Sequence, residues 1–197
     1  MAINSHSDDL KTIRKIMEES SRFLSLTGLS GVFAGIFALA GFTIAFMAIR
    51  NQEISEKGNL DLVLFIIALA VLTATLTVGV YLSYRKAVRT GERIWTGTAR
   101  RMLSNLLIPL LSGAVFILFF YLNHHYHYII PAMLIFYGLA LVSVGKFTYG
   151  EIHYLGILEV LTGIIALCFP DHGLIIWAFG FGLLHILYGL IMHKKYR

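Results

Sequence analysis

The stretch that decides the fold is residues 61–84, which reads DLVLFIIALAVLTATLTVGVYLSY. After Asp61 it contains no acidic, basic or histidine side chain until Arg85. About 20 apolar residues in a helix are enough to cross the hydrocarbon core of a bilayer. Backbone groups cannot stay unpaired in lipid, and the period-two alternation of a membrane barrel is absent. We therefore expect this segment to be a transmembrane helix.

The rest of the chain follows the same pattern. Of its 197 residues 57% are hydrophobic and 14% charged, whereas soluble domains carry about 25% charged residues. The mean hydropathy is +0.76, which excludes an ordinary soluble domain. We predict an all-α polytopic membrane protein, a six-transmembrane-helix bundle made of three helical hairpins. The predicted spans are residues 26–49, 61–84, 104–122, 129–147, 153–169 and 174–192.

Two flanking segments complete the predicted organisation. Residues 1–25 place Leu10, Ile13 and Met17 on one helical face with charged residues on the others. This pattern predicts an amphipathic N-terminal helix lying on the cytoplasmic surface of the membrane. Residues 193–197 form a basic tail. The single cysteine, Cys168, excludes an internal disulfide and a cysteine metal cluster.

The distribution of lysine and arginine predicts the orientation. With the N-terminus inside, 14 of the 16 Lys and Arg residues lie on the inner side, and only Arg50 and Lys57 lie outside. This bias predicts that both termini are cytoplasmic, in a plasma membrane or bacterial inner membrane. The connection over residues 85–103 is the most basic segment, and we expect it to contact anionic lipids or a cytoplasmic protein partner. Its candidate contact residues are Arg85, Lys86, Arg89, Arg93, Trp95, Arg100 and Arg101. No nucleic-acid-binding motif is present.

The spans also repeat one another. Residues 35–39 (GIFAL) in the first span match residues 163–167 (GIIAL) in the fifth. The even-numbered spans carry Gly79, Gly145 and Gly189 shortly before their cytoplasmic ends. Glycine lets membrane helices approach closely, so we interpret these positions as packing contacts.

One part of the chain resembles a known family. Residues 156–164 (GILEVLTGI), the Phe169-Pro170 turn and the glycine-bounded residues 180–189 resemble the repeat of the HdeD-like family. That family comprises small bacterial inner-membrane proteins with six spans, and its namesake is associated with acid resistance. The resemblance implies the six-span architecture and a stress-related role, and it carries over no catalytic residue. The first four spans depart from the repeat, because they lack the proline after the odd-numbered helix.

Ionisable residues inside spans are costly to bury and often functional. Counting from the turn at Pro170, Glu159 and His185 lie at nearly the same depth on adjacent antiparallel helices. Tyr188, one turn after His185, is a candidate third member. Two interpretations stay open: a structural hydrogen bond that locks the last hairpin, and a proton-sensitive or solute-binding site.

A second group of candidates lies at the predicted outer face. Histidine titrates near neutral pH, so this cluster allows a response to external acid. Histidine and aspartate also ligate transition metals, although no HExxH motif occurs. The outer candidates are His124, His125, His127, Asp171 and His172.

These observations rank three hypotheses. The first is a non-enzymatic stress-response, sensory or accessory membrane protein with pH sensitivity, present as a monomer or a homo-oligomer. The second is a small-solute or proton transporter that uses Glu159 and His185. The third is a metal-dependent membrane enzyme built on the outer histidines. No catalytic motif and no cofactor-binding fingerprint supports an enzyme.

Overall fold

The computed structural model describes residues 27–51, 60–91 and 95–196, and within them no strand occurs. Six helices are long and apolar enough to span a membrane, as the sequence predicted. The predicted amphipathic helix over residues 1–25 lies outside the described residues. The helical elements in chain order are α2 (Gly28–Arg50), α4 (Leu60–Thr90), α5 (Gly97–Leu122), η1 (Tyr126–Tyr128), α6 (Ile129–Val144), α7 (Gly150–Cys168), η2 (Pro170–His172), α8 (Gly173–Trp177), η3 (Ala178–Leu184) and α9 (His185–Lys195).

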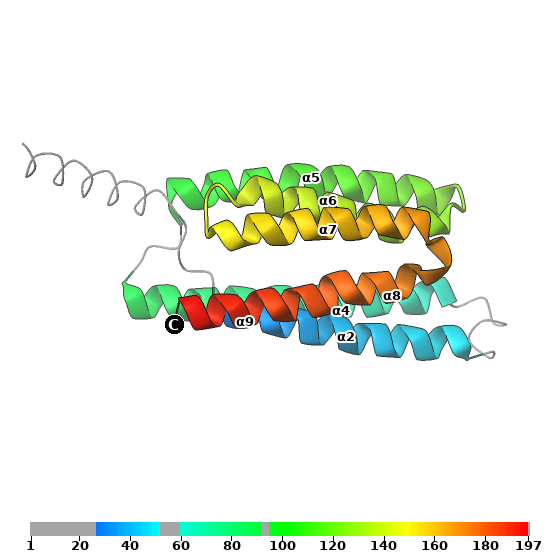
Figure 1. The fold of residues 1–197 in the computed structure, drawn as a ribbon, viewed down its shortest axis with the longest axis horizontal. Helices are drawn as coiled ribbons and strands as arrows, with labels where there is room; N and C mark the ends of the chain where they lie inside the picture. Colours follow the sequence, from blue (N-terminus) through cyan, green and yellow to red (C-terminus); the bar gives the residue numbers. More distant parts are fainter. Residues whose placement is uncertain (1–26, 52–59, 92–94, 197) are drawn as a thin grey trace, which may run out of the picture.

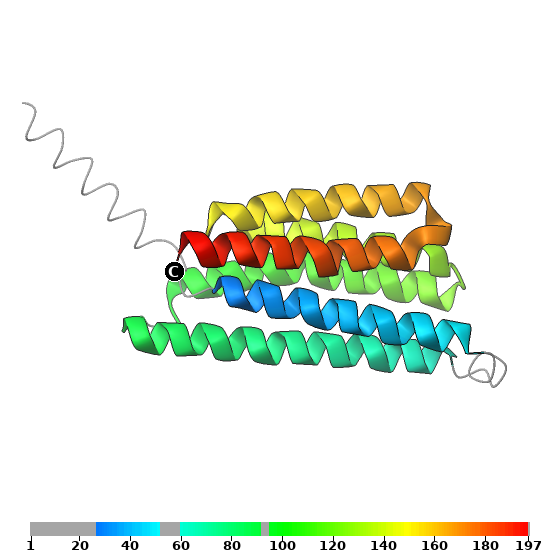
Figure 2. The ribbon, with the colours of Figure 1, turned by 60° about the horizontal axis from the view of Figure 1, so that its bottom comes forward.

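The helices form two layers (Figure 1), with α5, α6 and α7 in one and α2, α4 and the α8–η3–α9 rod in the other. Following the contacts, the order is α4, α2, α9, α7, α6 and α5, and the helices at its two ends do not pack against each other. The second view (Figure 2) shows the same long, nearly parallel rods. Helices α4 and α5 bury almost none of their side chains, which is expected for helices whose apolar surfaces face lipid.

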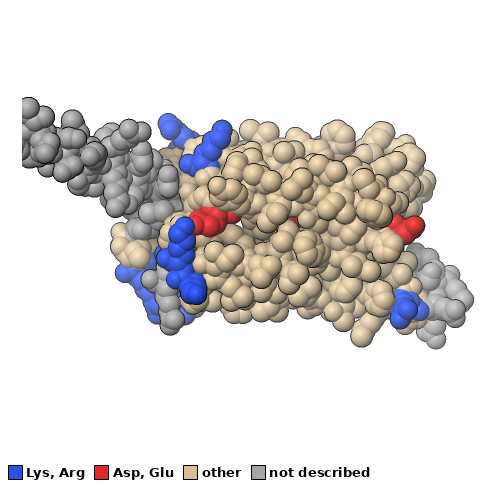
Figure 3. Space-filling view, viewed as in Figure 1, with Lys and Arg blue, Asp and Glu red and all other residues tan. Residues whose placement is uncertain are grey.

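The two ends of the bundle differ in composition. We call the end that carries Thr27, Thr90, Gly97 and Lys195 the basic end, and the end that carries η1 and η2 the histidine end. In the face shown in Figure 3, lysine and arginine gather mainly at the basic end, and the long flank between the ends is uncharged. A charge-free flank with polar ends matches the profile of a bilayer.

The connection predicted over residues 85–103 is shorter in the structure. Helix α4 continues to Thr90 and α5 already begins at Gly97. At about 1.5 Å per residue, the 31 residues of α4 extend roughly 46 Å, which exceeds a hydrocarbon core of roughly 30 Å. The last turns of α4 therefore leave the apolar layer as helix and present their basic side chains from a rigid element.

Glycine backbones make the closest helix contacts. At the α2–α9 interface, a Cβ atom on Gly35 would lie 2.4 Å from the Gly182 carbonyl oxygen, and one on Gly189 would lie 2.6 Å from that of Gly28. At the α6–α7 interface, a Cβ on Gly138 would lie 2.7 Å from the Gly156 carbonyl oxygen, and the reverse contact is equally short. At these glycines backbone meets backbone, and side chains such as Ile186 and Val160 pack beside the contacts. We call the two pairs glycine-sealed.

The repeat in the sequence coincides with these sealed pairs. Residues 28–39 and 156–167 share six identities in twelve positions, and residues 138–145 and 182–189 both begin and end with glycine. Each of the four helices thus carries glycines seven residues apart, on one face. Within this alignment Gly31 takes the place of Glu159 and Leu141 that of His185, so the two polar residues are not part of the repeat.

We predict that Gly138→Ala destabilises the bundle by about 1–3 kcal/mol, because the added methyl group collides with the backbone of α7. The matched control is Gly79→Ala in α4, where nothing lies within 4 Å of the new Cβ. That substitution should leave the free energy of unfolding unchanged or raise it by up to about 1 kcal/mol, because alanine has a higher helix propensity than glycine. Equilibrium unfolding in detergent micelles, followed by circular dichroism, measures both. Equal stability of the two variants would contradict the sealed α6–α7 interface.

Candidate functional site

The candidate site lies where α7 meets the last span, at a local change of helix type. Residues Ala178–Leu184 form a π-helical segment between α8 and α9. Short π segments within α-helices are frequently found at functional sites. Gly180 in this segment faces α7 so closely that a Cβ there would lie 2.8 Å from Oε2 of Glu159. The absence of a side chain at Gly180 therefore makes room for the carboxyl group.

Glu159 and His185 come together in this space. Glu159 is 0% exposed and His185 is 5% exposed. Oε1 of Glu159 lies 3.3 Å from Nδ1 of His185, which is within ion-pair distance. Neither carboxylate oxygen has a hydrogen-bond partner among the described residues. The contact is thus close but poorly aligned, and the carboxyl group has no committed donor.

Both ring nitrogens of His185 have partners. Nδ1 lies 3.1 Å from the Gly180 carbonyl oxygen, which can only accept, so the hydrogen sits on Nδ1 and donates. Nε2 lies 2.8 Å from the hydroxyl of Tyr137 on α6. That hydroxyl donates when the imidazole is neutral and accepts when it is charged. The network can therefore hold His185 in either protonation state.

Aromatic rings cover the network. The ring of Phe181 lies 5.0 Å from that of Tyr137 and 5.9 Å from that of His185, measured between centroids. Trp177 lies 5.3 Å from Phe181, one turn further toward the histidine end. These rings exclude water from the His185 side of the pair, and a dry surrounding strengthens every electrostatic interaction inside it.

The sequence placed Tyr188 with the pair, whereas the structure places Tyr137 there. No hydrogen bond joins Tyr188 to Glu159 or His185, and its ring instead lies against α2, where a Cβ on Gly31 would come within 3.1 Å of it. The sequence did not indicate Tyr137 as a partner of His185, because Tyr137 lies on another hairpin. Its one sequence signal was a hydroxyl in the middle of an otherwise apolar span.

The outer candidates do not form a metal centre in the structure. Among the described residues, no group of three or more His, Cys, Asp or Glu side chains is arranged to hold an ion. His124 has a φ of 59° and its Nδ1 lies 2.9 Å from the Tyr126 hydroxyl, while the rings of His125 and His127 lie 6.3 Å apart. Asp171 and His172 lie in the neighbouring η2 turn, in contact with η1. The geometry therefore gives the metal-dependent enzyme no support.

The basic candidates divide between two helices. Arg85, Lys86 and Arg89 lie on the last turns of α4 rather than in a loop. Arg100 and Arg101 lie on the first turns of α5, and the Arg100 guanidinium sits 5.9 Å from the centre of the Trp95 ring. Arg93 lies outside the described residues.

A group of polar contacts, which we call the clasp, links the two helix layers at the basic end. Lys86 of α4 donates to the hydroxyl of Tyr149, just before α7, at 3.2 Å. Lys195 of α9 pairs with Glu151 of α7 at 2.5 Å, and the Tyr196 hydroxyl also donates to Glu151, at 3.1 Å. The rings of Tyr149 and Tyr196 lie 4.1 Å apart. The clasp therefore ties α7 to both α4 and α9.

Comparisons with protein-family models, curated proteins and solved structures find no match for this chain. The proposals below therefore stand on the geometry and on the residues themselves.

We predict that His185→Leu destabilises the protein by about 3–5 kcal/mol, because it leaves the Glu159 carboxyl buried without its neighbour. The double variant Glu159→Leu/His185→Leu should recover most of that loss, since apolar replacement of a buried pair is often neutral. Tyr137→Phe should cost about 0.6 kcal/mol, the average for a hydrogen bond between membrane helices. Unfolding in micelles measures all three variants, and a double variant as unstable as His185→Leu would contradict the coupling.

Proposed function

We propose that this is a non-enzymatic, acid-responsive membrane protein in which Glu159 and His185 form a buried proton switch. The observation that carries the proposal is the Glu159 carboxyl group: it is 0% exposed, lies 3.3 Å from an imidazole nitrogen and has no hydrogen-bond donor among the described residues. A purely structural pair would be expected to satisfy its oxygens. A carboxyl group that accepts no hydrogen bond can gain or lose a proton without breaking one.

The charge balance of the pair explains why it would respond to acid. One proton on the pair leaves it neutral overall, whether the proton rests on the carboxylate or on the imidazole. A second proton leaves a net positive charge inside an apolar layer, which is expensive unless water enters. The two sites interact, so the gain of a proton belongs to the pair and not to either residue alone.

The groups facing the pair from each packed element bear on this response. Helix α6 contributes the Tyr137 hydroxyl, the π segment contributes the Gly180 carbonyl, and α2 faces Tyr188 through Gly31. None of these groups carries a formal charge that would neutralise a second proton. The junction of α7 with α9 is also packed less extensively than the glycine-sealed pairs. We infer that acidification loosens α9 from α7 at the π segment.

The resemblance of the last hairpin to the HdeD-like family supports the same assignment, because that family's namesake is associated with acid resistance. The positive-inside bias supports a plasma or inner membrane with the basic end in the cytoplasm. Anionic lipids at that end are the partners we propose.

Hydrogen exchange in nanodiscs at pH 7 and pH 5 tests the switch. At pH 5, wild-type amides in residues 178–184 should exchange faster than the same amides in Glu159→Gln. Asp61→Asn is the matched control, because it changes an exposed carboxyl group at the start of α4, away from the junction of α7 with α9. This control should keep the wild-type response. An exchange ratio that is the same at both pH values would rule out the switch.

Proton transport is the second candidate, favoured by the π-helical interruption beside a buried carboxyl group, since transporters place binding sites at interrupted helices. It predicts proton flux in proteoliposomes that Glu159→Gln abolishes. The complete burial of Glu159 opposes this candidate, and we expect flux no greater than in empty vesicles. Flux that depends on Glu159 would replace the switch with transport.

A further inference from the structure

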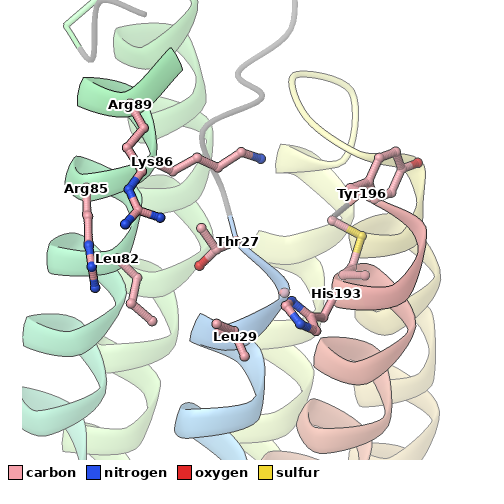
Figure 4. Close-up of a pocket in the computed structure, with 10 residues that line it drawn as sticks. Thr27, Leu29, Leu82, Arg85, Lys86, Arg89, His193 and Tyr196 are labelled. Carbon is pink, nitrogen blue, oxygen red and sulfur yellow. The ribbon is translucent and has the colours of Figure 1, made fainter. Parts of the chain in front are cut away.

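A pocket of about 310 Å³ opens at the basic end, where α2, α4 and α9 meet. Its volume is at the lower end of the range for small-molecule sites, roughly 300–1,000 Å³. Figure 4 shows Arg85, Lys86 and Arg89 projecting from α4 on one side and Thr27 and His193 on the other. Among the described residues of the lining, the three side chains with a permanent charge are all basic.

The cations of this pocket are only partly neutralised by the described part of the chain. Arg85 and Arg89 are one turn apart on the same face of α4, and neither forms an ion pair with a described residue. Lys86 is held toward α7 by its bond to the Tyr149 hydroxyl. Each guanidinium group can bind a phosphate group through two parallel hydrogen bonds, so two arginines on adjacent turns in one pocket wall favour a phosphate ligand.

The opposite wall adds to the positive potential. Helix α2 begins in the pocket wall at Gly28, and its N-cap residue Thr27 makes no side-chain capping hydrogen bond. The positive end of the helix dipole therefore lies beside the pocket. The Thr27 hydroxyl oxygen is buried and has no hydrogen-bond partner among the described residues. A hydroxyl donor beside an open helix start is suited to an anionic oxygen.

The floor of the pocket is apolar. Leu29 of α2, Leu82 of α4 and Met192 of α9 line it, and Figure 4 shows Leu29 and Leu82 below the basic side chains, further along the helices toward the middle of the bundle. A free phosphate ion gains nothing from such a floor. A phospholipid fits both parts, since its phosphate would meet the arginines while the start of an acyl chain covers the leucines.

We propose that this pocket is a binding site for one anionic phospholipid, held by its phosphate between Arg85, Arg89 and the start of α2. The site is separate from the buried pair, and its assignment does not depend on the proton switch. It differs from general attraction between a basic surface and a membrane because it is a single site with a defined stoichiometry and an apolar floor.

Native mass spectrometry of the full chain released from micelles tests the site, with phosphatidylglycerol and phosphatidylcholine of the same acyl chains as probes. We expect one tightly bound phosphatidylglycerol per chain. Arg85→Gln/Arg89→Gln should weaken it by on the order of 30-fold, the loss of about two charge contacts. The matched control, Arg100→Gln/Arg101→Gln, removes the same charge from the same end outside the pocket and should weaken binding by less than about threefold. Equal losses in the two double variants would overturn the site.

Two further measurements test the site even if the Arg85→Gln/Arg89→Gln variant folds poorly. Leu82→Trp fills the floor without changing the charge, and it should weaken phosphatidylglycerol binding by about tenfold through lost space for the chain. Unchanged binding in that variant would contradict the placement of the lipid. Inorganic phosphate should not displace the lipid, and displacement by phosphate would assign the pocket to a free anion instead.

Discussion

Close contact between glycine backbones is the constraint on which the rest of this structure depends. In a bilayer the hydrophobic effect does not drive helices together, so association relies on tight packing and on polar contacts. The pairs α2–α9 and α6–α7 meet this requirement with glycines. Because these residues lack side chains, the two backbones pack so closely that an added Cβ would lie less than 3 Å from the facing backbone. Without these contacts, the apolar helices would have no preference for one another over lipid.

The location of the polar pair follows from that arrangement. Each sealed pair is rigid because backbone fills the interface, and the two pairs meet along α7 and the last span, where packing is thinner. At this junction the chain places Glu159, His185 and a π-helical segment instead of another glycine contact. The repeat makes the contrast plain, because the positions in α2 and α6 that align with Glu159 and His185 are Gly31 and Leu141. The titratable pair therefore sits at the junction where these helices pack least extensively.

The sequence predicted the six spans because the length and composition of a membrane helix are set by the bilayer. It located Glu159 and His185 at one depth because the tight turn at Pro170 fixes the register of two antiparallel helices, and the structure places the two groups 3.3 Å apart. The predicted span ends at residue 84, whereas helix α4 continues to Thr90, because hydropathy detects where the apolar layer ends and not where the helix ends. Tyr137 and the π segment were missed because a partner on another hairpin and a change of helix type leave no local pattern.

The last span connects the two proposed sites. From His185 to Met192 is two helical turns, about 10 Å along α9, and Met192, His193 and Tyr196 line the pocket. Gly28 lies directly against His193, so α9 cannot shift without changing the pocket wall next to the start of α2. If protonation of the pair moves α9, linkage requires that lipid in the pocket change the proton affinity of the pair by the same factor. The Glu151–Lys195 contact of the clasp sets the end of α9 against α7 and so limits how far such a movement can spread. Coupling between acid and lipid would thus follow from one rigid helix that contributes residues to both sites.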